Sequence, residues 1–277
     1  MRNLFVLVIL IFTTLSCTKE VPPTIPGGGG VVATIPAPFT ALTGIFGGQG
    51  VGASVNIGDE IILFFSSDGT QYAWFEDTEL KFTRNVKAAD SHFSGYLFDD
   101  VGAVIDFEEE QLFFFNDSGS EYQEASLNPD MVAGNSADLT LFNFAPTSLE
   151  LEQWGKPDAC PFDEIGAAFG FSKEPLGCAM VGDDDDFLWM VSEDGDMLSR
   201  YVKETKSFDP VFEIAKWRSE NVCGGSPLIF PLASIGASCI YEPEMEDLRE
   251  LYFSEDGQSF VFLNTTKGEY SEVFSLK

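Results

Sequence analysis

The hydrophobic pattern of the chain repeats four times after residue 38. Each copy has three large or apolar residues, a short polar stretch and a Gly. The copies align without a gap at 63–69, 113–119, 189–195 and 251–257. Three residues after each Gly stands Tyr72, Tyr122, Leu198 or Phe260. Because Gly accepts the positive φ of a tight turn, each copy predicts a β-hairpin.

A second motif precedes each hairpin. It is a β-branched residue followed by Gly-Ala, at 51–53, 101–103, 165–167 and 235–237. Small residues suit an innermost strand, where backbones approach closely. Residues 39–277 give about 60 residues per unit, enough for the four short strands of one propeller blade.

The repeat predicts an all-β fold, a four-bladed β-propeller. The expected blades are roughly 39–93, 94–156, 157–222 and 223–277. The Phe-rich runs would be second strands buried on both faces, and 139–144 would supply an outer strand. A β-sandwich or barrel of short antiparallel strands is the alternative, but it gives no reason for four matched units.

The paired motifs resemble the hemopexin-like repeat, which is a four-bladed propeller. This chain has Gly where that repeat usually has Asp before Ala, and its turns read Asp-Gly. It also has no Cys pair to join the first blade to the last. The resemblance implies the fold, but heme binding is not expected, because His92 alone cannot supply two axial ligands.

The amino end predicts export. Residues 1–16 have the form of a signal peptide, with Arg2 before an apolar stretch too short to span a bilayer. The small residue before Cys17 resembles the lipobox of bacterial lipoproteins, which implies acylation of Cys17 and attachment to the outer membrane. Residues 17–38 would be a Pro/Gly-rich tether. An ordinary signal peptide is the alternative, and the cell surface and the periplasmic side both remain open.

Composition narrows the class of protein. The chain has 277 residues, with 45 acidic against 15 basic ones and a formal net charge of −30. Such a polyanion is a poor partner for nucleic acid. A hydrophobic content of 44% argues against disorder.

Four cysteines follow Cys17: Cys160, Cys178, Cys223 and Cys239. In an exported protein this even number suggests two disulfides, and the preferred pairings are 160–178 and 223–239.

Acidic residues gather between each Gly-Ala strand and the following Phe-rich strand. Propeller geometry places these four connections on one face. They hold 15 carboxylates against one cation, Arg249: Asp59 and Glu60; Asp106, Glu108, Glu109 and Glu110; Asp183, Asp184, Asp185 and Asp186; Glu242, Glu244, Glu246, Asp247 and Glu250. Carboxylate oxygens are ligands for Ca²⁺, and the second and third connections are the candidate metal ligands. The alternative is that these acids only keep the protein soluble.

Two functions remain open. The first is a non-enzymatic binding or adhesion module, tethered to the membrane, whose acidic face takes Ca²⁺ or a basic partner, with a protein or glycan as its ligand. The second is an extracytoplasmic glycan hydrolase using paired carboxylates. In that case the aromatics Tyr72, Trp74, Trp154, Trp189 and Trp217 could stack on sugar rings, but aromatics that alternate along strands more often belong to the core. The sequence identifies no catalytic residue.

Overall fold

The computed structural model describes most of the repeat region. The described residues are 34–36, 39–57, 61–76, 79–89, 91–93, 95–108, 111–126, 147–148, 160–170, 187–216, 218–219, 228–241, 249–264 and 269–277. The chain divides into two compact units, Met1–Val31 and Val32–Lys277, and the first lies outside these ranges. Among the described residues, no helix has the length and apolar character needed to cross a membrane.

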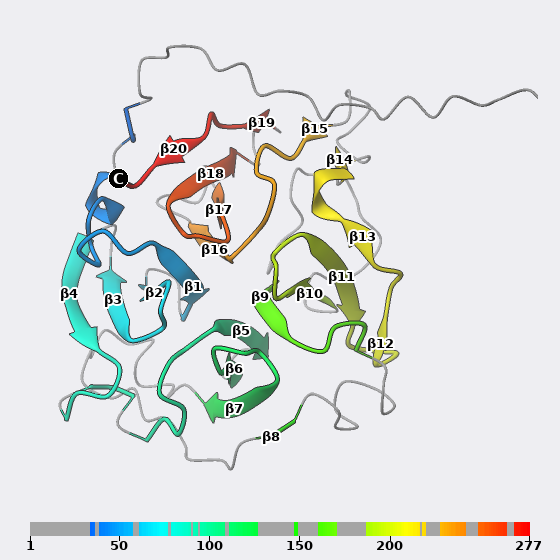
Figure 1. Ribbon diagram of the computed structural model, residues 1–277, viewed down its shortest axis with the longest axis horizontal. Helices are drawn as coiled ribbons and strands as arrows, with labels where there is room; N and C mark the ends of the chain where they lie inside the picture. The colour runs from blue at the N-terminus through cyan, green and yellow to red at the C-terminus, as the bar shows by residue number, and fades with distance from the viewer. Residues whose placement is uncertain are drawn as a thin grey trace, which may run out of the picture. The chain divides into compact units, whose positions relative to one another are not determined.

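Four antiparallel sheets are arranged as a four-bladed β-propeller, which confirms the predicted fold (Figure 1). Blade 1 comprises β1 (Val51–Asn56), β2 (Ile61–Ser66), β3 (Gln71–Glu76) and β4 (Glu79–Asn85). Blade 2 comprises β5 (Ala103–Glu108), β6 (Gln111–Phe115), β7 (Glu121–Ser126) and β8 (Thr147–Ser148). Blade 3 comprises β9 (Ile165–Gly170), β10 (Phe187–Ser192), β11 (Met197–Val202), β12 (Ser207–Phe208) and β13 (Phe212–Glu213). Blade 4 comprises β16 (Ala237–Tyr241), β17 (Arg249–Phe253), β18 (Ser259–Asn264), β19 (Glu269–Tyr270) and β20 (Phe274–Ser275).

Shorter elements lie at the edges of the blades. These are the 3-10 helices η1 (Phe39–Leu42) and η5 (Ile214–Lys216), and the strand pair β14 (Arg218–Ser219) and β15 (Leu228–Ile229). The outer strands of blades 2, 3 and 4 have two residues each, whereas β4 of blade 1 has seven. The edges of blades 3 and 4 are each formed by two separate segments that pair with the same third strand. The predicted outer strand at 139–144 lies outside the described residues.

The Gly-Ala motifs lie at or beside the innermost strands, as predicted. The four inner strands β1, β5, β9 and β16 contact one another around the axis (Figure 1). In every blade the inner strand pairs with the Phe-rich strand in the same register, for example Ala53 opposite Phe65 and Ala237 opposite Phe253. A β-sandwich or a single barrel would not bring these four strands together, so that alternative is wrong.

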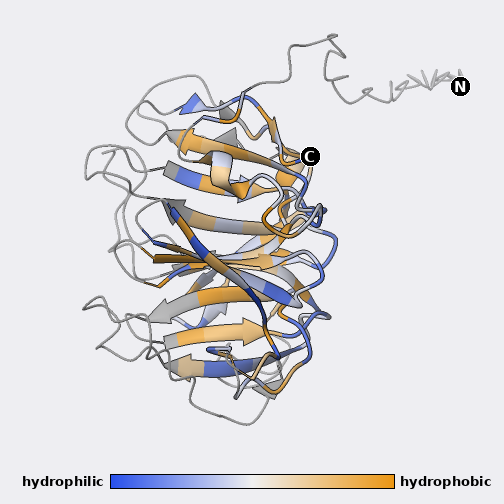
Figure 2. Ribbon diagram, turned by 90° about the vertical axis from the view of Figure 1, so that its left-hand side faces the viewer, coloured by the Kyte–Doolittle hydropathy of each residue, from blue (hydrophilic) through white to orange (hydrophobic). Residues whose placement is uncertain are grey.

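The Phe-rich strands are buried on both faces, again as predicted. In β2, Ile62 and Phe64 pack in the apolar layer shared with blade 4, whereas Leu63 and Phe65 pack in the layer shared with blade 2. Hydrophobic residues therefore predominate along the central strands of the blades (Figure 2). Burial of this apolar area between neighbouring blades supplies the main stabilisation of the ring.

The two sequence motifs interlock at each junction between blades. The amide of each β-branched residue donates to the carbonyl of the turn Gly in the preceding blade. The bonds are Val101 N to Gly69 O at 3.1 Å, Ile165 N to Gly119 O at 3.2 Å, Ile235 N to Gly195 O at 2.8 Å and Val51 N to Gly257 O at 3.1 Å. The last of these closes the ring between blade 4 and blade 1.

The segment from η1 to the start of β1 also helps to close the ring. Phe39 of η1 packs on blade 4, with its ring centroid 5.8 Å from that of Phe260 and 5.5 Å from that of Phe262. The side-chain amide of Gln258 donates to the carbonyl of Gly48 at 3.2 Å. The segment before β1 therefore joins blade 4 to blade 1 without a shared strand.

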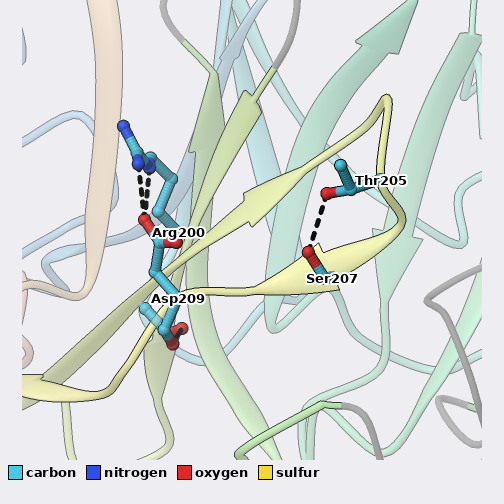
Figure 3. A network of polar contacts seen from close by, with 5 residues as sticks. Arg200, Thr205, Ser207 and Asp209 are labelled. Atoms are coloured by element: carbon cyan, nitrogen blue, oxygen red, sulfur yellow. Dashed lines mark hydrogen bonds and ion pairs between the residues drawn. The ribbon is translucent and has the colours of Figure 1, made fainter.

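The outer hairpin of blade 3 is held by polar contacts (Figure 3). The guanidinium of Arg200 donates through Nε to Asp209 Oδ2 at 2.6 Å, and the Ser199 hydroxyl donates to the Asp209 carbonyl at 2.8 Å. The hydroxyls of Thr205 and Ser207 lie 2.7 Å apart beside the turn. Both members of the Arg200–Asp209 ion pair are partly exposed, so it contributes at most about 1 kcal/mol and serves mainly to fix the edge.

Candidate functional site

The strand ends that carry the four acidic connections lie on one face of the propeller. Each inner strand pairs antiparallel with its second strand, so each connection leaves and returns at the same end of the blade. Strand β5 extends through Asp106 and Glu108, which places both residues in the strand instead of in the connection. Glu109, Glu110 and all of Asp183, Asp184, Asp185 and Asp186 lie outside the described residues.

No metal centre is found within the described part of the chain. No group of three or more His, Cys, Asp or Glu side chains there is arranged to hold an ion. Calcium binding by the acidic connections therefore stays a prediction. Cys17 and the tether also lie outside the described residues, so acylation stays a prediction as well.

The Asp residues of the turns bond to their own turn. Asp68 Oδ1 accepts from the Ser66 hydroxyl at 2.6 Å and from the Thr70 amide at 3.1 Å. Partial burial raises the pKa of Asp68, but these hydrogen bonds and one from Gln49 outweigh it and leave the pKa below its usual value. The same bonds recur around Asp256 in blade 4. These carboxylates stabilise the turns.

Acidic residues are not confined to the face of the connections. The opposite face, which carries the turns, includes Asp68, Asp117, Asp163, Glu164, Glu193, Asp194, Glu255 and Asp256. A hydrogen bond with the Glu164 carboxyl, together with its negative charge, raises the pKa of Glu193. Acidic residues therefore lie on the turn face as well as in the four connections.

The structure describes one cysteine of each preferred disulfide. Cys160 and Cys239 are free thiols, while Cys178 and Cys223 lie outside the described residues. Cys239 is buried in the apolar layer between blades 4 and 1, and burial raises the pKa of its thiol to about 12. A partner for Cys239 would have to enter this packed layer, and the 160–178 and 223–239 pairings stay predictions because Cys178 and Cys223 are not described.

Two of the aromatic residues considered for sugar binding belong to the core. Tyr72 and Trp74 are fully buried in the layer between blades 1 and 2. The Tyr72 hydroxyl lies 2.8 Å from Nδ1 of His92, and the His92 ring stacks on Phe82. The single histidine thus takes part in an aromatic cluster at the edge of blade 1, which is a structural role.

One carboxyl group is placed where the sequence did not predict it. Glu250, assigned to an exposed acidic connection, is in strand β17 and is only 2% exposed. Its Oε2 accepts a hydrogen bond of 2.7 Å from the Tyr252 hydroxyl, and its Oε1 has no hydrogen-bond partner among the described residues. Burial raises the pKa of Glu250 to about 7, although the bond from Tyr252 lowers it.

The surroundings of Glu250 are aromatic. Phe230 packs against Tyr252 and Tyr270, with ring centroids 5.2 and 5.5 Å away. Burial and the nearby Glu250 carboxyl raise the pKa of Tyr270. A raised carboxyl pKa in aromatic surroundings suits a general acid, but the burial of Glu250 closes it to a substrate.

The internal repeat gives a signal that would have found this residue. The second strands of the other three blades carry Ile62, Leu112 and Leu188 at the position equivalent to Glu250, and all three are buried. Glu250 is the acidic residue at a position that is otherwise aliphatic. Phe230 and Tyr270 lie outside both repeated motifs, so no comparable signal identifies them.

Comparison with known proteins gives neither a family nor a function. No protein-family model matches the chain. No curated protein matches it either. Among solved structures it is similar to a glutaminyl cyclase from Myxococcus xanthus, with 9% identity over 82% of this chain and 71% of that one, and a TM-score of 0.37.

Two other solved structures show the same limited likeness. A nidogen/laminin complex has 7% identity over 78% of this chain and 59% of that one, with a TM-score of 0.32. YCF48 bound to a D1 peptide has 9% identity over 82% of this chain and 69% of that one, with a TM-score of 0.30. Likenesses this distant carry no argument about this chain, and the hemopexin-like family remains a prediction.

Proposed function

We propose that this protein is an exported lipoprotein, anchored to the outer membrane through acylated Cys17, that acts as a binding module. Its ligand is Ca²⁺ or a basic surface on a protein or glycan partner, taken by the acidic connections. The supporting observation is that the strand ends flanking all four connections lie on one face around the axis. Like charges gathered on one face would attract a cation.

The face of the connections differs from the opposite face in one respect that bears on binding. On the turn face, Asp68 and Asp256 are engaged by hydroxyl and amide donors of their own turns. The connections hold up to four consecutive acids, and this sequence supplies no Ser, Thr or Gly between them at 183–186. This run contains no hydroxyl or amide side chain, and carboxylate oxygens are the ligands that Ca²⁺ takes.

Calorimetry with Ca²⁺ and with an oligolysine peptide tests this function on the chain from residue 18 onward. One variant replaces Asp183, Asp184, Asp185 and Asp186 with Asn. Its control removes the same charge from the turn face through Asp163→Asn, Glu164→Gln, Glu193→Gln and Asp194→Asn. We expect binding to weaken at least tenfold in the first variant and to change less than twofold in the control. Absence of binding by the unaltered chain, or equal weakening in both variants, would rule out this function.

A further inference from the structure

The interface between blades 3 and 4 differs from its three counterparts. We define this blade 3–4 interface by its buried cluster Ala167, Val191, Leu198, Ile214, Phe230, Leu232, Ile235, Tyr252, Val261 and Leu263. Trp189, Phe212 and Tyr270 pack against it and are partly buried. It is the interface that Glu250 enters from β17, on the same strand face as Tyr252, because side chains alternate along a strand.

The repeat shows that folding does not require a polar pair here. The residues equivalent to Glu250 and Tyr252 are Ile62 and Phe64 in blade 1, Leu112 and Phe114 in blade 2, and Leu188 and Met190 in blade 3. All six are buried and apolar. A buried carboxyl that has only one hydrogen bond is less favourable than such an aliphatic pair. Blade 4 thus has a destabilising buried carboxyl at a position where the other three blades have an aliphatic residue.

No described cation offsets the Glu250 charge. The ionisable groups that face it are Tyr252 on its own strand and Tyr270 on β19, and both are acids. The other described walls are apolar apart from the buried Ser238 hydroxyl, which is opposite Tyr252 on β16. They comprise Val261 and Leu263 from β18, Phe230, Leu232 and Ile235 from the segment before β16, and Val191, Leu198 and Ile214 from blade 3. An ionised Glu250 would therefore be a buried carboxylate held by one neutral hydroxyl.

We propose that the blade 3–4 interface is a proton-controlled joint, closed while the Glu250 carboxyl is protonated and loosened when it ionises. The direction follows from burial, which holds the pKa of Glu250 near 7 instead of its usual 4.5. The stabilisation is therefore complete below about pH 4.5 and is lost as the pH rises to about 7. In that range the folding constant falls by up to about tenfold per pH unit for one proton.

Fluorine NMR of the full-length protein in detergent, labelled with fluorotryptophan, tests the joint directly. Trp189 lies in the blade 3–4 interface, and its signal is assigned by its loss in Trp189→Phe. Trp74 lies in the layer between blades 1 and 2 and serves as the internal control. Between about pH 5.5 and 8.5, we expect the Trp189 signal to shift with a midpoint near 7, while the Trp74 signal stays in place.

Variants taken from the sister blades separate a proton switch from a packing effect. Glu250→Leu and Glu250→Gln should both abolish the shift of the Trp189 signal, and Glu250→Leu should also remove the loss of stability between about pH 5 and 7. Tyr252→Phe should move the midpoint upward, because the carboxylate loses its hydrogen-bond donor. The joint is ruled out if Trp189 does not respond to pH, responds unchanged in Glu250→Gln, or moves together with Trp74.

Discussion

At the scale of single residues, each blade junction requires a glycine, because two backbones meet there. Gly257 has a φ of +63°, and a Cβ built there would lie 2.4 Å from the Val51 nitrogen. Gly69 has the same relation to Val101, with the same 2.4 Å approach. The repeated Gly therefore does more than form a turn, since it also lets the neighbouring blade dock.

Replacing Gly257 with Ala should be much more damaging than replacing a glycine that only needs a positive φ. Gly44 is a matched control, because its φ is +70° and nothing lies within 4 Å of a Cβ built there. We expect Gly44→Ala to lower the free energy of unfolding by about 1 kcal/mol. Gly257→Ala should lower it by about 3 kcal/mol, because the clash adds to the strain. Urea unfolding measures both, and equal losses would contradict the docking role of Gly257.

At the scale of elements, the repeat supplies four similar sheets, but the ring is closed by a segment outside the repeat. The helix η1 and the residues up to β1 pack on the outer part of blade 4. Phe39 is only 3% exposed and contacts Phe260 and Phe262 there. Because this segment directly precedes the first blade, it holds the first and last blades together.

Truncating Phe39 should therefore destabilise the whole ring. Phe39→Ala removes a buried ring between two others, and we expect a loss of about 3 kcal/mol in the free energy of unfolding. Leu97→Ala is the control, because Leu97 is 51% exposed and its loss should stay within about 0.5 kcal/mol. A Phe39→Ala protein as stable as the control would show that the segment does not close the ring.

At the scale of the whole molecule, the parts that repeat were predictable and the parts that break the repeat were not. The Gly-Ala strands, the Phe-rich strands and the turns follow from local pattern, so the four sheets could be derived. The ring contacts of Phe39 and the packing of Phe230 on Tyr270 join segments far apart in sequence, and neither lies in a motif. Glu250 was misassigned because acidic residues next to a turn usually face solvent, whereas strand register carries this one inward.

The distribution of charge is also a property of the whole molecule. Its net charge of −30 is spread over both faces, since the turns and the connections each carry acids. The proposed binding function depends on the connections sharing a face, and that arrangement depends on a closed ring. If the blades did not interlock in turn, the four connections would have no common axis.

Hydrogen exchange at the four junction amides tests the closed ring most directly. The amides of Val51, Val101, Ile165 and Ile235 each donate to a turn Gly of the preceding blade. We predict that at about pH 5, where Glu250 is protonated and the blade 3–4 interface is closed, all four exchange slowly and at similar rates in nitrogen-resolved NMR spectra of the native protein. Fast exchange of the Val51 amide with slow exchange of the other three would show that blades 4 and 1 do not meet, and would contradict the closed propeller.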